Sequence, residues 1–351
     1  MQEEIEKMKN INVALLGFGD LGQSFAKILL EKKDEIESIY NTTVNVVAIT
    51  TKTRGNLVDA WGIDLERVLN NIQETGVIPK NHELMLQRNS MDVAETVEYD
   101  VLIEMTPLQP EDGHIATDHV KAALKRGKHV ICANKGPLAW HYNELNELAQ
   151  ANNCKFLFES TVMDGTPVFS IVRENLKLCK VTEIKGIQNS TTNYLLQHIE
   201  NGENIDEVVE ETKKRGFLET NPKHDINGTE AATKMAALVN VLMGADITPK
   251  NIETEGIQSI TKEKIAEAAS RGNVIKHMCR AYEKNGELVV KVGPEEISKL
   301  DAYATVSGTS TAISITTDLM GTMTIIEQSP EIEQAGYGVF ADLLTIIKDM
   351  K

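Results

Sequence analysis

Three glycines near the start of the chain have a spacing that could hold a diphosphate. Gly17, Gly19 and Gly22 form the pattern G-x-G-x-x-G between an apolar run at 11–16 and a helical pattern at 21–30. Gly17 would permit a tight turn, Gly19 would let a pyrophosphate approach the backbone, and Gly22 would let a helix pack closely on a strand. The N–H groups at the start of that helix would face the phosphates. We therefore predict a dinucleotide site; the alternative is a glycine-rich turn without a ligand.

The segment after the second apolar run bears on which dinucleotide would bind. That run, 44–49, is followed by Thr50-Thr51-Lys52-Thr53-Arg54. An NAD site usually carries an acidic residue at this place to hold the ribose 2′-hydroxyl, and this segment has none. Because Lys52 and Arg54 suit a 2′-phosphate, the sequence favours NADP(H), with NAD(H) still possible. Both cations could instead be ordinary solvated charges of a loop.

A lysine follows another buried run and could take part in proton transfer. Lys135 comes soon after the apolar segment 129–132, in the sequence ANKGPLA. The carboxyl ends of parallel strands face the ligand crevice in open α/β sheets, so Lys135 would meet a cofactor or a substrate there. Desolvation would lower its pKa and let it exchange protons. An exposed loop lysine is an equal alternative on spacing alone.

A second lysine belongs to a cluster of opposite charges. Glu219, Asp225 and Glu230 precede or begin the strongest helical pattern of the chain, and Lys234 follows Glu230 by one turn. The carboxylates could bind the ammonium of a zwitterionic substrate, while Lys234 could bind its carboxylate or move a proton. The plainer interpretation is a well-capped helix start, with Asn227 and Glu230 at capping-box spacing and a surface ion pair between Glu230 and Lys234. A polar segment at 189–193 could likewise cap a helix or bind a ligand.

The elements that would position these residues fall into two parts. Strand and helix patterns alternate through the first part, which predicts right-handed crossovers and a Rossmann-type, doubly wound parallel sheet. After residue 150 the elements are longer and less regular, and 302–326 alternates Thr and Ser with apolar residues, as in antiparallel strands with one wet face. We expect an α/β protein with a dinucleotide-binding domain at 1–150, an α+β catalytic and dimerisation domain at 151–335, and a closing helix at 336–351 that packs back on the first domain.

Composition excludes several classes of function. The net charge of −16 disfavours binding to nucleic acid or to an anionic membrane. None of the four cysteines forms a C-x-x-C pair, and no His pattern indicates a catalytic zinc. The chain has no apolar run of membrane-spanning length and no signal-peptide pattern. Together with the scattered single thiols, these features predict a cytoplasmic protein.

The chain resembles the homoserine dehydrogenase family, in its form without an added ACT or aspartate kinase domain. The resemblance spans nearly the whole chain in ordered blocks: GFGDLGQ at 17–23, IEMTP at 103–107, GKHVICANKGPLA at 127–139, FESTVMDGTPV at 158–168, GIQNSTTNYLL at 186–196, GFLETNPKHDINGTEAATK at 216–234, EGIQSIT at 255–261 and TTDLMG at 316–321. The ANKGPLA block and the acidic series that ends in Lys234 are together quite specific, whereas the glycine loop alone is not.

The resemblance implies reversible reduction of L-aspartate 4-semialdehyde to L-homoserine, a step of threonine and methionine biosynthesis. Lys135 and Lys234 match the functional lysines of the family: the first lies near the carbonyl oxygen and the nicotinamide, and the second aids substrate binding and proton transfer. Which of them delivers the proton stays open. The residues implied in substrate binding are Thr191, Glu219, Asp225 and Glu230. Those expected at the cofactor are Gly17, Gly19, Asp20, Leu21, Gly22, Lys52, Arg54, Thr106 and Lys135.

Two further features are implied by the resemblance. Glu159, with the backbone of Val162 and Asp164, matches a loop that binds a structural sodium ion in relatives. The second domain of relatives forms a dimer, so we expect a homodimer.

The chain departs from the family pattern at several positions. Glu230 stands where an Asp is usual, Ser190 where a Gly is usual, and 327–331 reads EQSPE in place of a glycine-rich loop. These departures leave a sister reductase of another small amino or hydroxy aldehyde as the alternative function. A dinucleotide-sensing binding protein is a third possibility, against which both retained lysines argue.

Overall fold

The computed structural model describes residues 8–78, 88–204, 207–210 and 223–350. The chain divides into two compact units. The first comprises the chain up to Pro137, His141–Val168, and the chain from Glu331 onward; the second comprises Leu138–Trp140 and Phe169–Pro330. Each unit contains its own six-stranded sheet.

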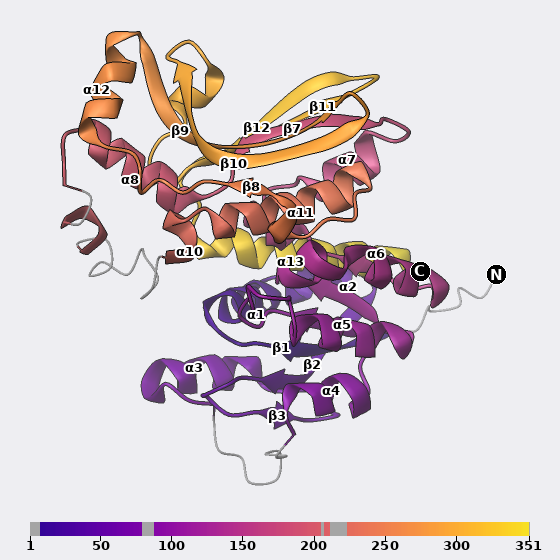
Figure 1. Ribbon diagram of the computed structural model, residues 1–351. Coiled ribbons are helices and arrows are strands. Elements are labelled where there is room, and N and C mark those ends of the chain that lie inside the picture. Colours follow the sequence, from indigo (N-terminus) through magenta and orange to yellow (C-terminus); the bar gives the residue numbers. More distant parts are fainter. Residues whose placement is uncertain (1–7, 79–87, 205–206, 211–222, 351) are drawn as a thin grey trace. The chain divides into compact units, whose positions relative to one another are not determined.

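The first unit is built on a nearly parallel sheet (Figure 1). Its strands, in spatial order, are β3 (Leu57–Val58), β2 (Thr42–Thr50), β1 (Lys9–Leu16), β4 (Val101–Glu104), β5 (His129–Cys132) and β6 (Phe156–Leu157). All neighbouring pairs are parallel except β2 and β3. The order reverses at β1, which places a topological switch point between β1 and β4, where nucleotides bind in such sheets. The predicted Rossmann-type sheet is therefore confirmed, with one antiparallel edge strand that the sequence pattern did not indicate.

Helices cover this sheet. They are α1 (Asp20–Glu31), α2 (Lys33–Tyr40), α3 (Leu65–Thr75), α4 (Ser90–Thr96), α5 (Ala116–Lys125), α6 (Gly136–Ala151) and α13 (Ile332–Asp349). The yellow helix α13 of Figure 1 packs against α1. Its residues Val339 and Leu343 share one apolar core with Val13 and Phe25, and a Cβ added to Gly336 would lie 2.3 Å from Oγ of Ser24, so the two helices are in close contact.

The first unit continues to Val168, well beyond the boundary expected near residue 150. The physical reason is that β6 pairs with β5 and completes the first sheet. The 3₁₀ turn that follows, Glu159–Thr161, is held by α13, because the N–H of Glu159 donates to Oδ2 of Asp342 at 2.8 Å. The apolar residues 156–158 predict a short strand, but a local pattern does not indicate which sheet that strand joins.

The second unit contains a mostly antiparallel sheet. Its spatial order is β12 (Gly321–Glu327), β11 (Thr311–Thr317), β7 (Val181–Ile187), β9 (Asn273–Lys284), β10 (Glu287–Ser298) and β8 (Glu253–Thr254). β8 alone pairs in parallel, with β10. The antiparallel pair β11–β12 confirms the alternating pattern at its C-terminal part. Ala302–Thr305 is a 3₁₀ helix instead of a strand, because the side chain of Asp301 caps it by accepting the N–H of Tyr303.

The helices of the second unit include one that is buried over most of its surface. They are α7 (Phe169–Asn175), α8 (Ser190–Glu200), α10 (Lys223–Ile226), α11 (Thr229–Met243) and α12 (Lys262–Ser270), with a 3₁₀ turn at Pro249–Asn251. Helix α11 contacts β7, β9 and β10. Its buried side chains run from Ala231 to Asn240 with Lys234 as the half-buried exception. The sequence at 206–214 also has a helical pattern, but most of these residues lie outside the described ranges.

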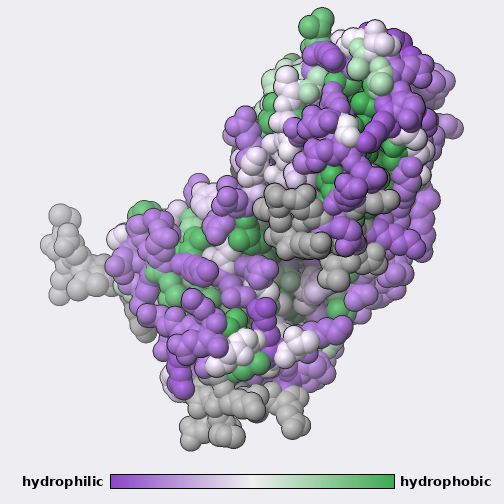
Figure 2. Space-filling view, turned by 90° about the vertical axis from the view of Figure 1, so that its left-hand side faces the viewer, coloured by the Kyte–Doolittle hydropathy of each residue, from purple (hydrophilic) through white to green (hydrophobic). Residues whose placement is uncertain are grey.

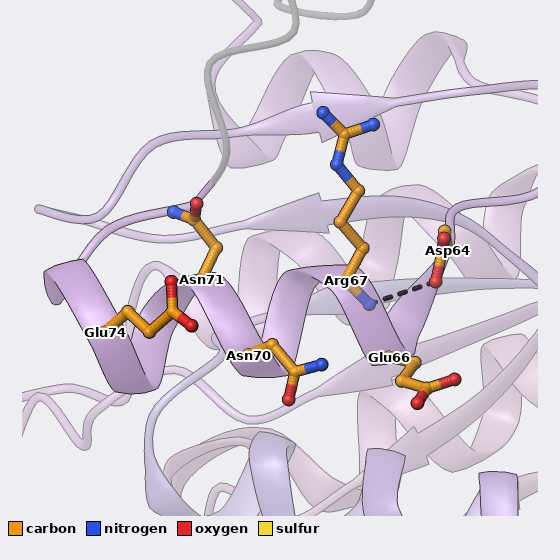
Figure 3. Close-up of a pocket in the computed structure, with 6 residues that line it drawn as sticks. All are labelled: Asp64, Glu66, Arg67, Asn70, Asn71 and Glu74. Carbon is orange, nitrogen blue, oxygen red and sulfur yellow. Dashed lines mark hydrogen bonds between the residues drawn. The ribbon is translucent and has the colours of Figure 1, made fainter.

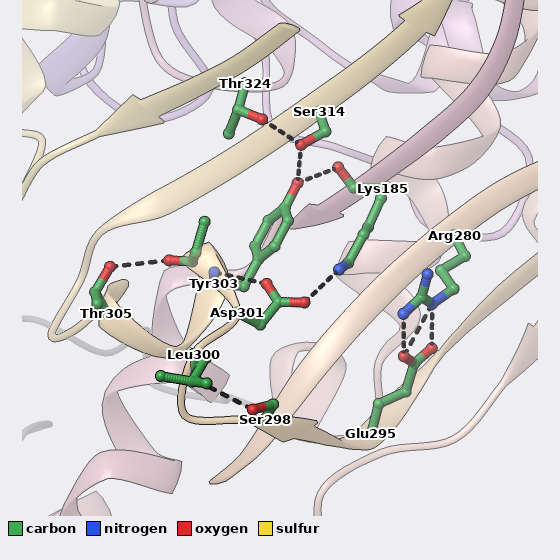
Figure 4. Close-up of polar contacts among 11 residues, drawn as sticks. Lys185, Arg280, Glu295, Ser298, Leu300, Asp301, Tyr303, Thr305, Ser314 and Thr324 are labelled. Atoms are coloured by element: carbon green, nitrogen blue, oxygen red, sulfur yellow. Dashed lines mark hydrogen bonds and ion pairs between the residues drawn. The ribbon is translucent and has the colours of Figure 1, made fainter. Parts of the chain in front are cut away.

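A chain of polar side chains ties the short turn before β11 to the sheet (Figure 4). The hydroxyl of Tyr303 donates to the carbonyl of Lys185 at 2.8 Å or to Oγ of Ser314 at 2.7 Å, and Ser314 shares a hydrogen bond with Thr324. The ammonium of Lys185 lies 3.0 Å from Oδ2 of Asp301. Burial raises the pKa of Tyr303 to about 12, so its hydroxyl keeps its proton at physiological pH. This network holds β7, β11 and β12 together.

The molecular surface is mainly polar on the face drawn in Figure 2. Hydrophobic residues lie on this face in scattered patches. Within the described ranges, no helix is long and apolar enough to cross a membrane.

Candidate active site

The glycine turn between β1 and α1 has the geometry that a phosphate cradle requires. Gly17 has a φ of 92°, and a Cβ there would lie 2.4 Å from the carbonyl oxygen of Met105. A Cβ at Gly22 would lie 3.0 Å from the carbonyl oxygen of Gly17, whereas one at Gly19 would meet no atom within 4 Å. Gly17 and Gly22 therefore serve the close packing of turn and helix, and Gly19 leaves open space beside the backbone. A diphosphate fits this turn, because a side chain at position 19 would fill that space.

The start of α1 offers N–H groups that no side chain caps. Gly19 is the N-cap residue and has no side chain that could cap the helix; its carbonyl oxygen accepts the side-chain amide of Gln23 at 3.2 Å, and the first turn begins with Asp20 and Leu21. Uncapped N–H groups and the helix dipole favour an anion. Asp20 is exposed, so its carboxylate can turn toward solvent.

The loop after β2 is well ordered by its own side chains. The N–H of Thr51 donates to Oδ1 of Asn56 at 2.7 Å, and the N–H of Arg54 donates to the hydroxyl of Thr51 at 2.8 Å. The guanidinium of Arg54 donates to the carbonyl of Phe18 at 3.3 Å, which places it beside the glycine turn. Lys52 is exposed on the same loop. Two cations thus lie where the ribose of a dinucleotide is held in this fold.

The carboxyl ends of β4 and β5 meet through Thr106 and Asn134. The side-chain amide of Asn134 donates to the carbonyl of Thr106 at 2.8 Å and its oxygen accepts the N–H of Gly136 at 2.9 Å. Lys135 lies between Asn134 and Gly136 in the chain and directly precedes α6. Because a Cβ at Gly17 would also lie 2.9 Å from the N of Thr106, the glycine turn, Thr106 and the Lys135 segment share one edge of the first sheet. The predicted cofactor residues of three separate segments are brought together there.

Sequence reasoning missed the buried groups beneath this edge. Glu104 and His119 are fully buried, and Asn134 is nearly so. A charged residue directly after the apolar run of β4 was the available signal. Nearby Cys132 is buried as well, and burial, with the charge of Glu104, holds the pKa of its thiol well above the ordinary value. A neutral thiol of this kind is not a nucleophile.

The loop expected to bind sodium lies within the first unit. Glu159 is nearly buried, and its Oε1 accepts the N–H of Val168 at 2.5 Å. Val162 is buried, and Asp164 has a φ of 45°. Within the described part of the chain, no group of three His, Cys, Asp or Glu side chains could hold a metal ion. A sodium site here would therefore depend mainly on backbone oxygens, which suit a hard cation.

The second unit gathers most of the predicted substrate residues at the ends of three helices. Asn189 caps α8 by accepting the N–H of Thr192 at 2.8 Å, so the capping alternative for this segment is correct. Its amide also donates to Oδ1 of Asp225 on α10 at 2.6 Å. Thr191 lies in the first turn of α8, beside this contact. Glu219 lies outside the described residues.

The start of α11 differs from the predicted capping box. Gly228, with a φ of 82°, is the N-cap residue, and Asn227 accepts the N–H of Thr229 instead of pairing with Glu230. A Cβ at Gly228 would lie 2.9 Å from Thr254. The chain must therefore turn sharply into α11, which moves the cap one residue later. Among the described residues, the ammonium of Lys234 makes no hydrogen bond or ion pair, so the predicted surface pair with Glu230 is not formed.

Two buried side chains on β9 lie under α11 and were not singled out from the sequence. Burial raises the pKa of Cys279 to about 12, and the charge of Lys234 acts in the opposite direction. His277 is 1% exposed, and burial lowers the pKa of its imidazole. Its Nε2 lies 2.9 Å from the carbonyl oxygen of Glu255.

A surface hollow on α3 contains none of the predicted site residues. It has a volume of about 390 Å³. Figure 3 shows its side chains, which are Asp64, Glu66, Arg67, Asn70, Asn71 and Glu74. They line one face of α3, and Asp64 caps the helix by accepting the N–H of Arg67. Their polar, open arrangement is typical of a solvated helix face.

Comparisons with known proteins agree with this geometry. The sequence model of the NAD-binding domain of homoserine dehydrogenase matches residues 17–159, and that of the homoserine dehydrogenase domain matches residues 167–344. A homoserine dehydrogenase from Methanocaldococcus jannaschii is 33% identical over 97% of this chain and 100% of its own length. An NAD(+)-dependent homoserine dehydrogenase from Pseudomonas canavaninivorans is 28% identical over 97% of both chains.

Solved structures show the same relationship. A crystal structure described as a putative homoserine dehydrogenase from Archaeoglobus fulgidus superimposes with a TM-score of 0.85, at 28% identity, over 96% of this chain and 99% of that one. A hyperthermophilic archaeal homoserine dehydrogenase in complex with NADPH superimposes with a TM-score of 0.81, at 27% identity, over 96% of this chain and 97% of that one. The two matching domain models and the full-length relatives leave one conclusion: this chain belongs to the homoserine dehydrogenase family.

Proposed function

We propose that this protein reduces L-aspartate 4-semialdehyde reversibly to L-homoserine, with NADPH preferred over NADH. The observation that carries the proposal is the meeting of the glycine turn, Thr106 and the Lys135 segment at one edge of the first sheet. These segments are separate in the chain and are the ones that the family resemblance assigns to the cofactor. A bound nicotinamide cofactor supplies the hydride.

The cofactor preference follows from the loop after β2. The residues between Thr50 and Asn56 include no carboxylate that would accept the ribose hydroxyl of NADH or repel a 2′-phosphate. Arg54 is held beside the glycine turn by a hydrogen bond from its guanidinium to the carbonyl oxygen of Phe18. Lys52 is exposed on the same loop. A fixed guanidinium pairs with a phosphate more strongly than with a hydroxyl. One relative is described as NAD(+)-dependent and another was solved in complex with NADPH. Members of the family are therefore known with either dinucleotide.

The residues of the chain have separate tasks in the reaction. Lys135 acts beside the nicotinamide, where its ammonium stabilises negative charge on the aldehyde oxygen during reduction. Lys234 binds the substrate and exchanges a proton with that oxygen or with solvent. Asp225 and Glu219 bind the substrate ammonium, with Thr191 and Glu230 as further contacts. Asn189 holds the carboxylate of Asp225 by a 2.6 Å hydrogen bond, so this group is oriented before the substrate arrives.

Two structural features belong to the same proposal. Glu159 and the backbone oxygens of Val162 and Asp164 would bind a sodium ion, and replacing sodium by choline should then lower the melting temperature. A homodimer is expected from the family, and sedimentation would test it. A cytoplasmic location stays a prediction.

The test is an assay with L-homoserine and either NADP⁺ or NAD⁺, followed by the absorbance of the reduced nicotinamide. We expect turnover with both and a higher kcat/KM with NADP⁺. No reduction with either cofactor at high enzyme concentration would contradict the proposal.

Ser190 and Glu230, which depart from the family pattern, favour a second candidate, a reductase of another small amino or hydroxy aldehyde. A panel of short amino alcohols separates the two, because a site with buried polar groups rejects ligands that leave those groups unpaired. Faster oxidation of another alcohol than of homoserine would support the second candidate.

A further inference from the structure

Glu104 is a fully buried carboxylate in the middle of the first sheet. It ends β4 and lies opposite Leu16 of β1 and Cys132 of β5. A carboxylate is kept in such a place only if its oxygens are hydrogen-bonded, because desolvation of an unpaired charge is very costly. Neither the glycine turn nor the two lysines explain why the chain has an acid at this position.

The partners of Glu104 form a continuous polar chain. Its Oε2 lies 2.6 Å from Nδ1 of His119 on α5, which is itself fully buried. Nε2 of His119 lies 2.8 Å from the hydroxyl of Ser90 at the start of α4. On the other side, Oε1 of Glu104 accepts both the N–H of Thr106, at 2.7 Å, and the Thr106 hydroxyl. Both ring nitrogens of His119 and both oxygens of Glu104 are therefore engaged, and the chain ends at Thr106.

Thr106 is the point where this buried chain meets the cofactor edge. Its carbonyl accepts the amide of Asn134, and its N lies under Gly17. The carboxylate thus holds the backbone and the hydroxyl of Thr106 at the same time, and the orientation of that hydroxyl is determined from within the protein.

The direction of the Thr106 hydrogen bond has a chemical consequence. A hydroxyl has one proton, and the hydroxyl of Thr106 donates it to Glu104. Toward a ligand, Oγ1 can then only accept. The carboxamide nitrogen is the donor of a nicotinamide group, whereas its carbonyl oxygen can only accept.

We propose that Glu104 and His119 are positioning residues that make the Thr106 hydroxyl an acceptor for the carboxamide NH₂ of the nicotinamide, and so select one orientation of the ring. The inference rests on the proposed function, in which Thr106 lies beside the nicotinamide. His119 acts through Glu104, and Glu104 acts through Thr106.

The experiment compares the dissociation constants of NADP⁺ and of its acetylpyridine analogue, in which a methyl ketone replaces the carboxamide. The analogue has no N–H to donate, so the full-length wild-type protein should bind NADP⁺ roughly tenfold more tightly. Thr106→Val removes only the hydroxyl, and Glu104→Leu removes the group that orients it. Both variants should bring the ratio of the two constants close to one.

A conservative variant separates orientation from simple loss of structure. In Glu104→Gln, the amide oxygen can accept both donors of Thr106 while the amide NH₂ faces His119. The ratio of the two dissociation constants should therefore stay close to the wild-type value, unlike in Glu104→Leu. His114→Gln is the matched control, because His114 pairs with Asp118 at the exposed start of the same helix region; it should leave the ratio unchanged. Melting temperatures measured in parallel report folding.

The ratio of the two dissociation constants distinguishes this role from a structural one. General damage to the fold would weaken the binding of NADP⁺ and of its analogue equally and leave the ratio unchanged. A wild-type ratio near one, or an unchanged ratio in Thr106→Val, would overturn the inference and leave the proposed function intact. A wild-type protein that binds neither cofactor would overturn the proposed function, and this inference with it.

Discussion

The side-chain amide of Asn189 donates a 2.6 Å hydrogen bond to the carboxylate of Asp225. Asn189 caps α8 and Asp225 lies on the one-turn helix α10, so the bond joins two segments that carry predicted substrate residues. Asn189 holds this orientation because its oxygen is committed to the N–H of Thr192. One oxygen of the Asp225 carboxylate is thus fixed by the capping residue itself.

This relationship predicts the effect of neutralising Asp225. In Asp225→Asn, the amide oxygen can still accept from Asn189, so the contact survives while the charge that attracts the substrate ammonium is lost. We expect KM for L-homoserine to rise roughly 10- to 100-fold, the usual loss for a hydrogen bond to a charged group, with the dissociation constant of NADP⁺ unchanged. Steady-state kinetics and a binding titration measure both. Asp246→Asn, an exposed acid of the same unit, is the control, and an unchanged KM would remove Asp225 from the substrate site.

Lys234 should matter to turnover more than to cofactor binding. It is the half-buried residue on the otherwise buried stretch of α11. Lys234→Ala should lower kcat by about 100-fold or more, as expected for loss of a proton-transferring group, and should leave NADPH affinity nearly intact. Lys250→Ala, an exposed lysine of the same unit, should retain wild-type kinetics. Turnover within a few-fold of wild type would show that the role assigned to Lys234 is wrong.

Arg54 should determine the choice between the two dinucleotides. Its guanidinium is anchored to the carbonyl of Phe18 and can pair with a 2′-phosphate. Arg54→Ala should lower kcat/KM for NADPH by roughly tenfold or more, whereas kcat/KM for NADH should change little. Lys52→Ala should lower kcat/KM for NADPH by a smaller factor. Arg67→Ala, on the exposed face of α3, is the matched control. If kcat/KM falls equally for both cofactors, Arg54 supports the glycine turn and does not select the phosphate.

The first sheet and its glycine turn could be predicted from the sequence because long apolar runs and a fixed glycine spacing leave few alternatives. Gly17 and Gly22 are required by backbone contacts that any strand–turn–helix unit of this kind makes. The start of α11 could not be predicted in the same way. A capping box was expected at Asn227, but the chain enters α11 through the positive φ of Gly228 under β8, a tertiary constraint that local spacing does not contain.

The buried polar side chains could also not be predicted from hydrophobic periodicity. Glu104, His119 and Asn193 are fully buried, and Lys276 is 5% exposed, although Glu, Asn and Lys are usually exposed and His is intermediate. Each is tolerated because a partner from a distant segment satisfies it; Lys276, for example, donates to the carbonyl of Val306 at 2.6 Å. Such partners become neighbours only after folding, so the sequence pattern indicates the strands but not the polar groups that they enclose.

His277 predicts how stability depends on pH. It is buried on β9, and burial lowers the pKa of its imidazole below 6.5, against the opposing effects of the Glu255 carbonyl and carboxylate. The neutral ring is favoured in the folded state, so its contribution to stability is complete above about pH 6.5. As the pH falls below that value, the unfolded chain takes up a proton that the folded chain does not, and the free energy of unfolding decreases until the folded pKa is reached.

His277→Gln should remove this dependence, because a glutamine amide can donate to the same carbonyl of Glu255 without titrating. The measurement is the fall in melting temperature between about pH 7.5 and about pH 5.5, taken within each protein so that a uniform loss of stability cancels. We expect a smaller fall in the variant than in the wild type. An equal fall would mean that other groups dominate the acid sensitivity, and a larger one would mean that protonated His277 stabilises the folded state, which is the opposite of what its burial requires.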